Sequence, residues 1–304
     1  MSKVSVVVLT KNGGPLFRTC LEGVCAQTHA GKVEVIVVDS GSTDETLEIV
    51  KGHPVRLEQI PPESFHHART RNFAATLAGG EFLVFLSQDA VPGSNRWLQT
   101  MVANFDDPGV GAVYGRQVPK PGSSLERQDA LDAVYGEKKI VKDPANRNGQ
   151  GYRFYHFSDA NSAVRRSVWE ATRFPEDLKI FEDLGIAKRI LDAGWKIVYD
   201  PEPSVFHSHH HTTMGLFKRY FDIGYTLQRL KIADAPGMRS SLLRDGRKML
   251  GKKLRRLKNS EEGSGARVAI GQDIAKSVGL FLGLNQSYLP SVVRRRLSAH
   301  GVHN

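Results

Sequence analysis

Apolar runs and amphipathic stretches alternate along the first two hundred residues. Residues 4–9 and 33–38 are continuous runs rich in valine, as expected for strands that are buried on both faces of a sheet. Between them, apolar side chains recur at every fourth position, which predicts a helix over residues 15–27. The Ser-Thr-Asp-Glu segment at 42–45 supplies capping and acidic residues for a second helix. This order predicts an α/β fold with a mostly parallel sheet that is flanked by helices.

The alternation continues toward the C-terminus with one interruption. A third helix over residues 68–77 stops at two glycines, and residues 82–86 form the next strand. Residues 115–155 are irregular and rich in glycine, proline and charge, which indicates a long excursion near a ligand site. Regular patterns return at residues 161–171, 183–193 and 196–199, the last of which is a strand. Beyond residue 211 the chain is helical and increasingly basic.

Polar residues follow three of the predicted strands, at the point where each strand ends. They are Thr-Lys-Asn at 10–12, Asp-Ser-Gly-Ser at 39–42 and Ser-Gln-Asp at 87–89. In open α/β sheets, ligands bind beyond the carboxyl ends of the strands. We therefore expect these three segments to share one ligand site.

Two aspartates at these strand ends are candidate ligand contacts. Asp39 is placed to accept hydrogen bonds from a uracil or thymine ring or a ribose, and its alternative role is to cap the following turn. Asp89 is placed to hold Mg²⁺ or Mn²⁺ against a diphosphate, because these ions prefer oxygen ligands. The alternative for Asp89 is a turn residue that precedes Val91 and Pro92.

Charged residues elsewhere are candidates to complete such a site. Arg71, on the predicted third helix, is a candidate phosphate partner, whereas Arg69 fits better as a surface arginine. Glu182 and Asp183 start a helix, where they either cap it or supply a carboxylate base. His207 is the first of four histidines in five residues and lies closest to the last strand, so it is the candidate imidazole ligand for a metal. The histidine run is otherwise a solvated segment or part of a zinc site.

Taken together, these segments resemble the family 2 glycosyltransferases with the GT-A fold, over roughly residues 3–212. Each motif is short, but six of them occur in the expected order and spacing. They are Val-Val-Leu-Thr-Lys-Asn at 7–12, Val-Val-Asp-Ser-Gly-Ser-Thr-Asp at 37–44, Thr-Arg-Asn at 70–72, Phe-Leu-Ser-Gln-Asp-Ala at 85–90, Ser-Asp-Ala-Asn-Ser-Ala at 158–163 and Phe-Glu-Asp at 181–183. The resemblance implies an inverting enzyme that takes a sugar from a nucleotide-diphosphate donor.

The resemblance also implies an organisation and a set of catalytic residues. Residues 1–212 would form the catalytic domain, with a donor half at about 1–115 and an acceptor half at about 116–212, and residues 213–304 a helical basic C-terminal region. Asp183 would be the general base, with Glu182 as the second choice. The residues that would line the donor-sugar or acceptor pocket are Asp159 and Asn161.

Donor and metal contacts follow from the same resemblance. The usual Asp-x-Asp of the family appears here as Gln88-Asp89-Ala90, so Asp89 has no neighbouring carboxylate and His207 becomes the expected second metal ligand. The expected ion is Mg²⁺ or Mn²⁺. The residues expected to contact the donor are Thr10, Asn12, Asp39, Ser42, Arg71, Gln88 and Asp89.

Three segments resemble the bacterial rhamnosyltransferases of O-antigen and related cell-surface polysaccharides. They are Phe-His-His at 65–67, Ser-Gln-Asp-Ala at 87–90 and His-Ser-His at 207–209. This resemblance implies dTDP-L-rhamnose as the donor and a glycan or lipid-linked glycan as the acceptor. A UDP-sugar donor is the alternative within the family.

The net charge of +10 is concentrated in one segment of the 304-residue chain. Residues 239–258 hold nine Lys or Arg and one acid, so only about +2 remains for the rest. Leucines recur there at helical spacing, although Gly246 and Gly251 weaken a helix. A basic amphipathic helix suits an anionic membrane surface, and a solvated face or a subunit contact is the alternative. The oligomeric state is not predicted.

Two other classes of protein fit less well. A nucleic-acid-binding protein would explain the basic pI, but the charge is confined to one end and no aromatic-basic platform is present. A nucleotidyltransferase would share the sheet and the metal, yet it needs a glycine-rich loop with Arg and Lys after the first strand. The segment at 10–15 is too short for that loop.

The remaining sequence features concern the compartment. With Cys20 and Cys25 as the two cysteines, a disulfide framework is excluded and a reducing compartment is favoured. The first strand starts at residue 4, which leaves no room for a signal peptide, and no apolar run approaches the ~18–20 residues of a membrane span. We expect a cytoplasmic protein, peripheral on the cytoplasmic face of the inner membrane if the basic helix binds lipid.

Overall fold

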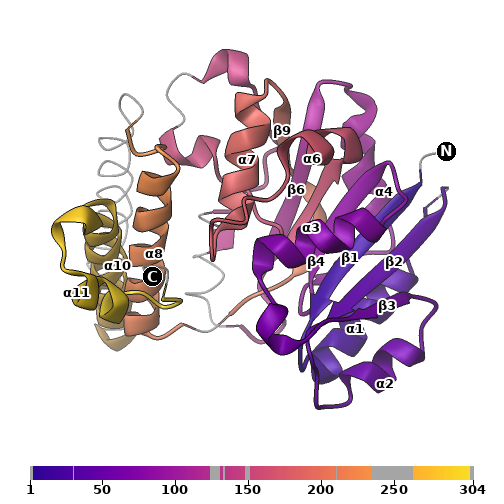
Figure 1. Cartoon of the computed structure of the whole chain (residues 1–304), viewed down its shortest axis with the longest axis horizontal. Helices are drawn as coiled ribbons and strands as arrows, with labels where there is room; N and C mark the ends of the chain where they lie inside the picture. Colours follow the sequence, from indigo (N-terminus) through magenta and orange to yellow (C-terminus); the bar gives the residue numbers. More distant parts are fainter. Residues whose placement is uncertain are drawn as a thin grey trace. The chain divides into compact units, whose positions relative to one another are not determined.

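The structure is a computed structural model that describes residues 3–29, 31–123, 131–132, 134–147, 151–209, 211–234 and 263–301 (Figure 1). The chain divides into two compact units. The first comprises Met1–Arg147, His156–Asp177 and Glu182–Ser208, and the second comprises Asn148–Tyr155, Leu178–Phe181 and His209–Asn304. The second unit thus includes two short segments from the middle of the sequence besides the C-terminal part from residue 209, and the expected catalytic domain over residues 1–212 stays a prediction.

The first half of the first unit follows the predicted alternation closely. Its elements are β1 (Val4–Thr10), α1 (Gly14–Cys25), β2 (Val33–Asp39), α2 (Thr46–Lys51), β3 (Arg56–Gln59), α3 (His67–Leu77) and β4 (Phe82–Ser87). Pro15 lies in the first turn of α1, where its missing N–H would have no helical partner in any case. The apolar pattern does not predict β3, because this strand is mostly polar and partly exposed at the edge of the sheet.

The second half of the first unit departs further from the pattern. Its elements are β5 (Val91–Pro92), α4 (Trp97–Ala103), β6 (Val110–Val118), β7 (Ile140–Lys142), β8 (Asn161–Arg165), α6 (Arg166–Thr172), α7 (Glu182–Asp192) and β9 (Lys196–Phe206). The irregular stretch expected from residue 115 starts only after Val118, and the regular stretch at 161–171 is a strand followed by a helix. β9 extends beyond Tyr199 because β6 pairs with its carboxyl end on one side and β5 on the other.

Within the described residues, nine strands form one sheet in the order β3-β2-β1-β4-β8-β6-β9-β5, with β7 paired to β9. β3, β2, β1 and β4 are parallel, and β8 runs antiparallel between β4 and β6. β9 is again parallel to β6. The carboxyl ends of β1, β2, β4, β6 and β9 and the amino end of β8 therefore meet at one edge of the sheet, which we call the ligand edge. The prediction of a mostly parallel sheet is confirmed.

Helices cover both faces of this sheet (Figure 1). α1, α2 and α4 lie on one face, where alternate valines of β1 pack with Phe17 and Leu21 of α1. α3, α6 and α7 lie on the other face, where the ring of Phe85 meets that of Phe174 edge-on with centroids 5.0 Å apart. Because both faces are covered, the central strands are apolar along most of their length and their polar residues are found at the ends.

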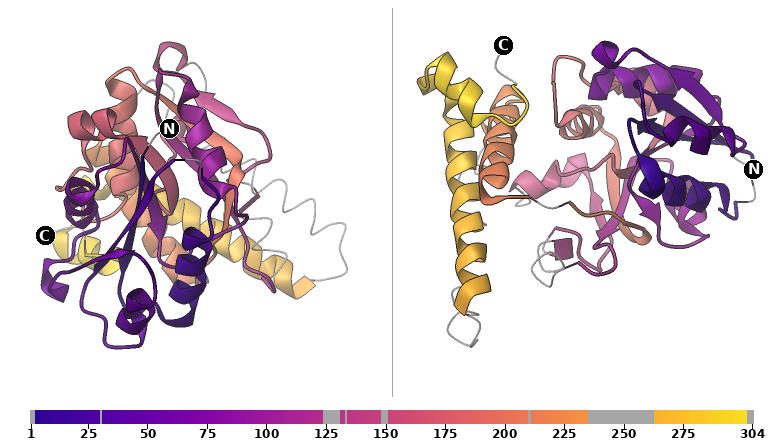
Figure 2. Two further views of the ribbon diagram at one scale, coloured as in Figure 1. Left: turned by 90° about the vertical axis from the view of Figure 1, so that its right-hand side faces the viewer. Right: turned by 90° about the horizontal axis from the view of Figure 1, so that it is seen from below.

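The second unit is helical in its described part. It contains two long helices, α8 (Thr213–Arg229) and α10 (Gly263–Leu284), and a shorter one, α11 (Ser291–Leu297). α8 and α10 lie side by side (Figure 2). Their backbones approach closely at Gly224 of α8 and at Gly279 and Gly283 of α10, where any side-chain carbon would overlap backbone atoms of the other helix. Glycine is therefore required at these positions by the packing.

No helix in the described ranges combines the length and the apolar character that crossing a bilayer demands. The basic segment at 239–258 lies outside the described residues, so the amphipathic helix expected there stays a prediction.

We predict opposite effects for two glycines on α10. Gly283→Ala places a methyl group against the Phe221 carbonyl oxygen and should destabilise the second unit by about 1–3 kcal/mol. Gly271→Ala is the matched control, because open space surrounds this position and alanine favours a helix by up to about 1 kcal/mol. Thermal and denaturant unfolding of both variants would measure the difference. Equal shifts of the two variants would contradict the close packing of α8 and α10.

Lys142, at the end of β7, is a buried lysine outside the ligand edge. Its ammonium donates to the carbonyl oxygen of His156 and lies 4.6 Å from the ring centroid of Tyr114. Burial lowers the pKa of Lys142 from 10.5 to about 7. Between these two pH values the unfolded chain therefore binds one proton that the folded chain does not, and folding stability rises with pH.

We predict that Lys142→Met removes this part of the pH dependence. The free energy of unfolding of the parent should rise relative to that of the variant by up to about 1.4 kcal/mol per pH unit between about pH 7 and pH 10. Urea unfolding at several pH values would measure this. The control is Lys139→Met, whose side chain is 52% exposed, and parallel curves for all three proteins would refute the burial argument.

Candidate active site

Thr10 and Gln88 connect the loops that follow β1 and β4 at the ligand edge. The Thr10 hydroxyl donates to Oε1 of Gln88 at 2.7 Å, and the backbone N–H of Lys11 donates to the same oxygen at 3.0 Å. Nε2 of Gln88 donates in return to the Lys11 carbonyl at 3.3 Å. Two expected donor contacts thus lie together, and the Gln88 amide is bonded to the neighbouring loop.

The turn after β2 surrounds the carboxylate of Asp39, which is fully buried. Oδ2 accepts from the backbone N–H groups of Gly41 and Ser42 at 3.0 Å each, and Oδ1 accepts from the Ser42 hydroxyl. The Ser42 oxygen also accepts from the backbone N–H of Asn12 at 2.8 Å, which ties this turn to the β1 loop. The capping role therefore describes Asp39 in this structure, and a contact with a nucleoside stays a prediction.

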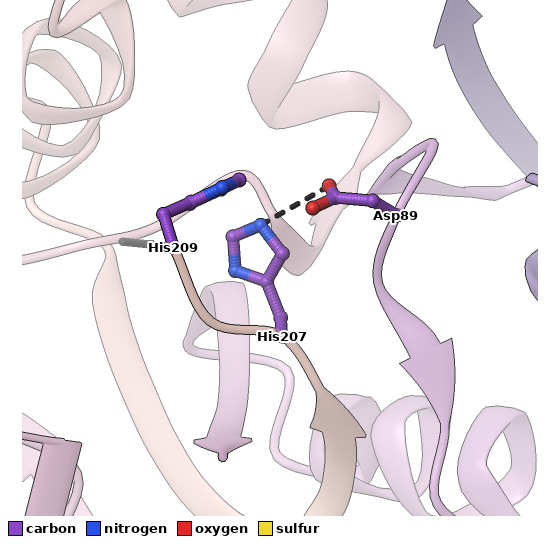
Figure 3. A group of neighbouring side chains, drawn as sticks. All are labelled: Asp89, His207 and His209. Carbon is purple, nitrogen blue, oxygen red and sulfur yellow. Dashed lines mark ion pairs between the residues drawn. The ribbon is translucent and has the colours of Figure 1, made fainter. Parts of the chain in front are cut away.

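Asp89 and His207 face each other at the ligand edge (Figure 3). Nε2 of His207, directly after β9, lies 3.2 Å from Oδ1 of Asp89, and Nζ of Lys120 lies 3.1 Å from Oδ2. His207 is buried, and the Asp89 side chain is 20% exposed. The structure thus brings together the two residues expected to bind metal, along with a lysine that the sequence does not single out.

Gln117 on β6 determines which nitrogen of His207 faces Asp89. Its Nε2 donates to the hydroxyls of Tyr135 at 2.7 Å and Ser158 at 2.8 Å, so its Oε1 is left to accept from Nδ1 of His207 at 2.8 Å. A neutral His207 then directs the lone pair of Nε2 at a carboxylate oxygen. Two acceptors that face each other in this way are suited to a cation between them.

The donor set at this position fits a divalent ion. Asp89, His207 and His209, two residues further along the same segment, each offer one ligand atom, and these atoms lie within 4.8 Å of one another (Figure 3). A carboxylate with imidazole nitrogens is a ligand set that Mn²⁺ accepts, and Mg²⁺ would rely more on oxygens from a bound diphosphate.

A buried ion cluster lies beside this edge, around Arg71 of α3. Its Nε lies 2.8 Å from Oδ2 of Asp159, before β8, and its Nη1 donates to Oε1 of Glu182, at the start of α7, at 2.7 Å. Burial and the carboxylates of Asp159 and Asp183 raise the pKa of Glu182 well above its usual value, against the lowering effect of Arg71. Burial by itself would lower the pKa of Arg71, but these carboxylates raise it, so the guanidinium stays charged.

This cluster engages Arg71 and Glu182, two of the expected site residues, and leaves Asp183 partly exposed. Arg71 is engaged by two carboxylates, so a phosphate contact stays a prediction that would require these ion pairs to rearrange. Glu182 is buried against Arg71, whereas Asp183 is partly exposed and accepts from the backbone N–H of Leu184 at 2.7 Å. Of the two expected bases, Asp183 is therefore the accessible one.

Asn161 has a structural role in this fold. It is fully buried, its Oδ1 accepts from the indole N–H of Trp97 at 2.9 Å, and its Nδ2 donates to the Pro203 carbonyl at 2.7 Å. These bonds hold the start of β8 against α4 and β9. The expected contact of Asn161 with a sugar or an acceptor is therefore not supported by its geometry.

Gln117 and Lys120 are site residues that the sequence reasoning missed. Both lie in the stretch from residue 115 that looks irregular, although Gln117 belongs to β6. A continuous apolar run at 110–114 was the available indication that a strand enters this stretch. Nothing in the sequence by itself pairs Lys120 with Asp89, because 31 residues separate them.

The sheet order, the helices on both faces and the polar loops at one edge define a protein of the GT-A fold class. The chain belongs to glycosyl transferase family 2, whose family model matches residues 5–172. It is therefore an enzyme of the glycosyltransferase class, as the sequence motifs predict.

Curated relatives resemble the chain over most of its length. It is 34% identical over 225 residues to the O-antigen chain rhamnosyltransferase RfbN of Salmonella typhimurium, covering 73% of this chain and 71% of the relative. It is 37% identical over 193 residues to the O-antigen chain rhamnosyltransferase WbaN of Salmonella anatum, covering 63% and 61%. The predicted resemblance to rhamnosyltransferases is confirmed.

Solved structures with low sequence identity share the fold. The mannosyltransferase PcManGT from Pyrobaculum calidifontis, solved in complex with GDP-Man and Mn²⁺, superposes with a TM-score of 0.63 at 21% identity, covering 93% of this chain and 87% of that one. S. aureus TarS 1–349 in complex with UDP-GlcNAc gives a TM-score of 0.58 at 18% identity, covering 97% and 86%. The prediction of a GT-A fold is confirmed.

We predict that Arg71 is essential for stability, whatever its role in donor binding. Arg71→Ala leaves the buried carboxylates of Asp159 and Glu182 without their cation and should cost about 3–5 kcal/mol of unfolding free energy. Arg69→Ala, two residues away on the exposed side of α3, should change it by less than about 0.5 kcal/mol. Denaturant unfolding of both variants would test this, and a small effect of Arg71→Ala would show that the cluster is not a stabilising element.

Proposed function

We propose that this enzyme transfers L-rhamnose from dTDP-L-rhamnose to a glycan or lipid-linked glycan acceptor, with inversion at the anomeric carbon. The observation that supports a nucleotide-diphosphate donor most strongly is the Asp89–His207 pair at the ligand edge, with its imidazole oriented by Gln117. The choice of rhamnose is supported by the two Salmonella relatives, both of which are O-antigen chain rhamnosyltransferases.

In this proposal Asp89 and His207 hold Mg²⁺ or Mn²⁺. The bound ion would supply positive charge next to the diphosphate. The diphosphate is the leaving group and takes the electron pair of the broken C1–O bond. Thr10, Asn12 and the turn of Asp39 lie on the neighbouring strand ends and would receive the nucleoside.

Asp183 is the proposed general base. A carboxylate at the start of α7 is stabilised as an anion by the helix, and its partial exposure leaves it accessible to an acceptor hydroxyl. It would take the hydroxyl proton as that oxygen attacks C1. Glu182 is unsuited to this task because it is buried and paired with Arg71.

We place the acceptor at an anionic membrane surface on the cytoplasmic side. The second unit supports this, because Ile274, Val278 and Phe281 of α10 lie at helical spacing, 43–60% exposed, on the side opposite its packing glycines. On α11, Arg295 and Arg296 are exposed beside Val292. Exposed apolar and cationic side chains in one unit suit a lipid surface.

The first experiment is a measurement of nucleotide-diphosphate release from dTDP-rhamnose, UDP-glucose and GDP-mannose with Mn²⁺ and a lipid-linked acceptor. We expect turnover of dTDP-rhamnose, and a loss of about 10²–10⁴-fold in kcat for Asp183→Asn with donor binding retained. Asp89→Ala should lose cation binding as measured by calorimetry. Asp192→Asn, at the other end of α7, is the matched control and should keep full activity.

These measurements test the donor sugar, the catalytic base and the class of donor separately. Turnover of another donor would overturn rhamnose and keep the sugar transfer. Full activity of Asp183→Asn would overturn the choice of base. If no nucleotide sugar binds with or without Mn²⁺, the donor class itself is wrong.

A further inference from the structure

Both oxygens of the Asp89 carboxylate have a partner of their own. Oδ1 faces His207 at 3.2 Å, and Oδ2 faces the ammonium of Lys120 at 3.1 Å. The Lys120 side chain is only 26% exposed, so solvent weakens this ion pair less than it weakens a pair on the open surface. Any cation that binds Asp89 through Oδ2 has to compete with the lysine.

The backbone of Lys120 is held in place, whereas its side chain is long and flexible. Pro119 and Pro121 restrict the chain on either side, and the backbone N–H of Lys120 donates to Ser208 at 3.3 Å. The backbone N–H of His207 donates to the Val118 carbonyl at 2.9 Å, which fastens the same loop to the end of β9. A change of partner at Lys120 is therefore a movement of the flexible side chain alone.

The residues around Asp89 provide too little positive charge to balance a diphosphate, so a second cation would contribute. Gln88 and Ala90, on either side of Asp89, carry no charge, and the Gln88 amide is bonded to Thr10 and Lys11. A divalent ion on one carboxylate and a neutral imidazole leaves a diphosphate leaving group with uncompensated negative charge. An ammonium 3.1 Å from that carboxylate is close enough to supply the missing positive charge.

We propose that Lys120 is a displaceable counter-ion of Asp89. A divalent cation that binds Oδ1 beside His207 and also Oδ2 takes its place, and the released ammonium binds the diphosphate of the donor and stabilises it as a leaving group. The C1–O bond breaks with its electron pair on the β-phosphate oxygen, and Lys120 neutralises that charge without making or losing a bond. The second half of this proposal rests on the proposed function, whereas the competition at Asp89 does not.

A cavity beside Lys120 gives the side chain space to change partner. It has a volume of about 300 Å³, and its lining includes Lys120, Arg116, Pro121 and Phe206. Arg116 is engaged there by Asp132 at 2.9 Å, so Lys120 is the cation of this lining that is directed at Asp89. The cavity thus lies against Lys120 and against Phe206, the residue that precedes His207.

The test is calorimetric titration of Mn²⁺ into the full chain without any donor. Lys120→Ala should bind Mn²⁺ about fivefold more tightly than the parent, because the competing ammonium is gone. The matched control is Lys196→Ala, since Lys196 forms an ion pair of the same 3.1 Å length with Asp107 at the opposite end of β9. Unchanged or weaker Mn²⁺ binding by Lys120→Ala would overturn the competition.

The second titration uses dTDP at saturating Mn²⁺. Lys120→Ala should bind dTDP at least about tenfold more weakly, Lys120→Arg should recover most of the loss, and Lys196→Ala should match the parent. Tighter Mn²⁺ binding without this loss would overturn the leaving-group role. UDP and GDP in the same titration separate this result from the donor assignment, because a preference for either would overturn dTDP while the effect of Lys120 persists. Equal melting temperatures of parent and variants would show that all of them are folded.

Discussion

One buried guanidinium joins three segments of the first unit beside the ligand edge. Arg71 comes from α3, Asp159 from the segment before β8 and Glu182 from the start of α7, so the ion pairs join three parts of the chain that are far apart in sequence. Charges buried at this depth are tolerated only when each has its partner. The position of Asp183, next to Glu182, follows from the same cluster, and so does the path of the chain into β8.

A second set of contacts gives the ligand edge its chemistry. Tyr135 and Ser158 orient the amide of Gln117, Gln117 orients His207, and His207 faces Asp89. Such outer contacts decide which ring nitrogen is available to a cation. Lys120, in the loop after β6, contacts the other oxygen of the Asp89 carboxylate, so Asp89 lies between an ammonium and an imidazole. The site is therefore an assembly of β4, β6 and β9 and does not belong to any one loop.

The parts that sequence patterns predicted correctly are those that depend on local chemistry. The apolar runs of β1, β2 and β4 need burial on both faces, and this requirement is visible in any short window. The Asp89–His207 pair was predictable because both residues follow strands, and strand ends of one orientation share an edge. The partner of Arg71 was not predictable in this way. The sequence around an arginine on a helix is the same whether its side chain faces solvent, a phosphate or two buried carboxylates.

The sequence by itself determined the family, the α/β alternation, the polar strand ends and the candidate metal ligands, because each is encoded in the order of residues along continuous stretches of the chain. Only the tertiary structure decided that Arg71 pairs with Asp159 and Glu182, that Asn161 is buried with Trp97, and that Lys120 reaches Asp89. These contacts join residues 31 to 111 positions apart, and the antiparallel insertion of β8 between β4 and β6 helps to bring them together. The partner of a charged side chain depends on that topology, which no local pattern contains.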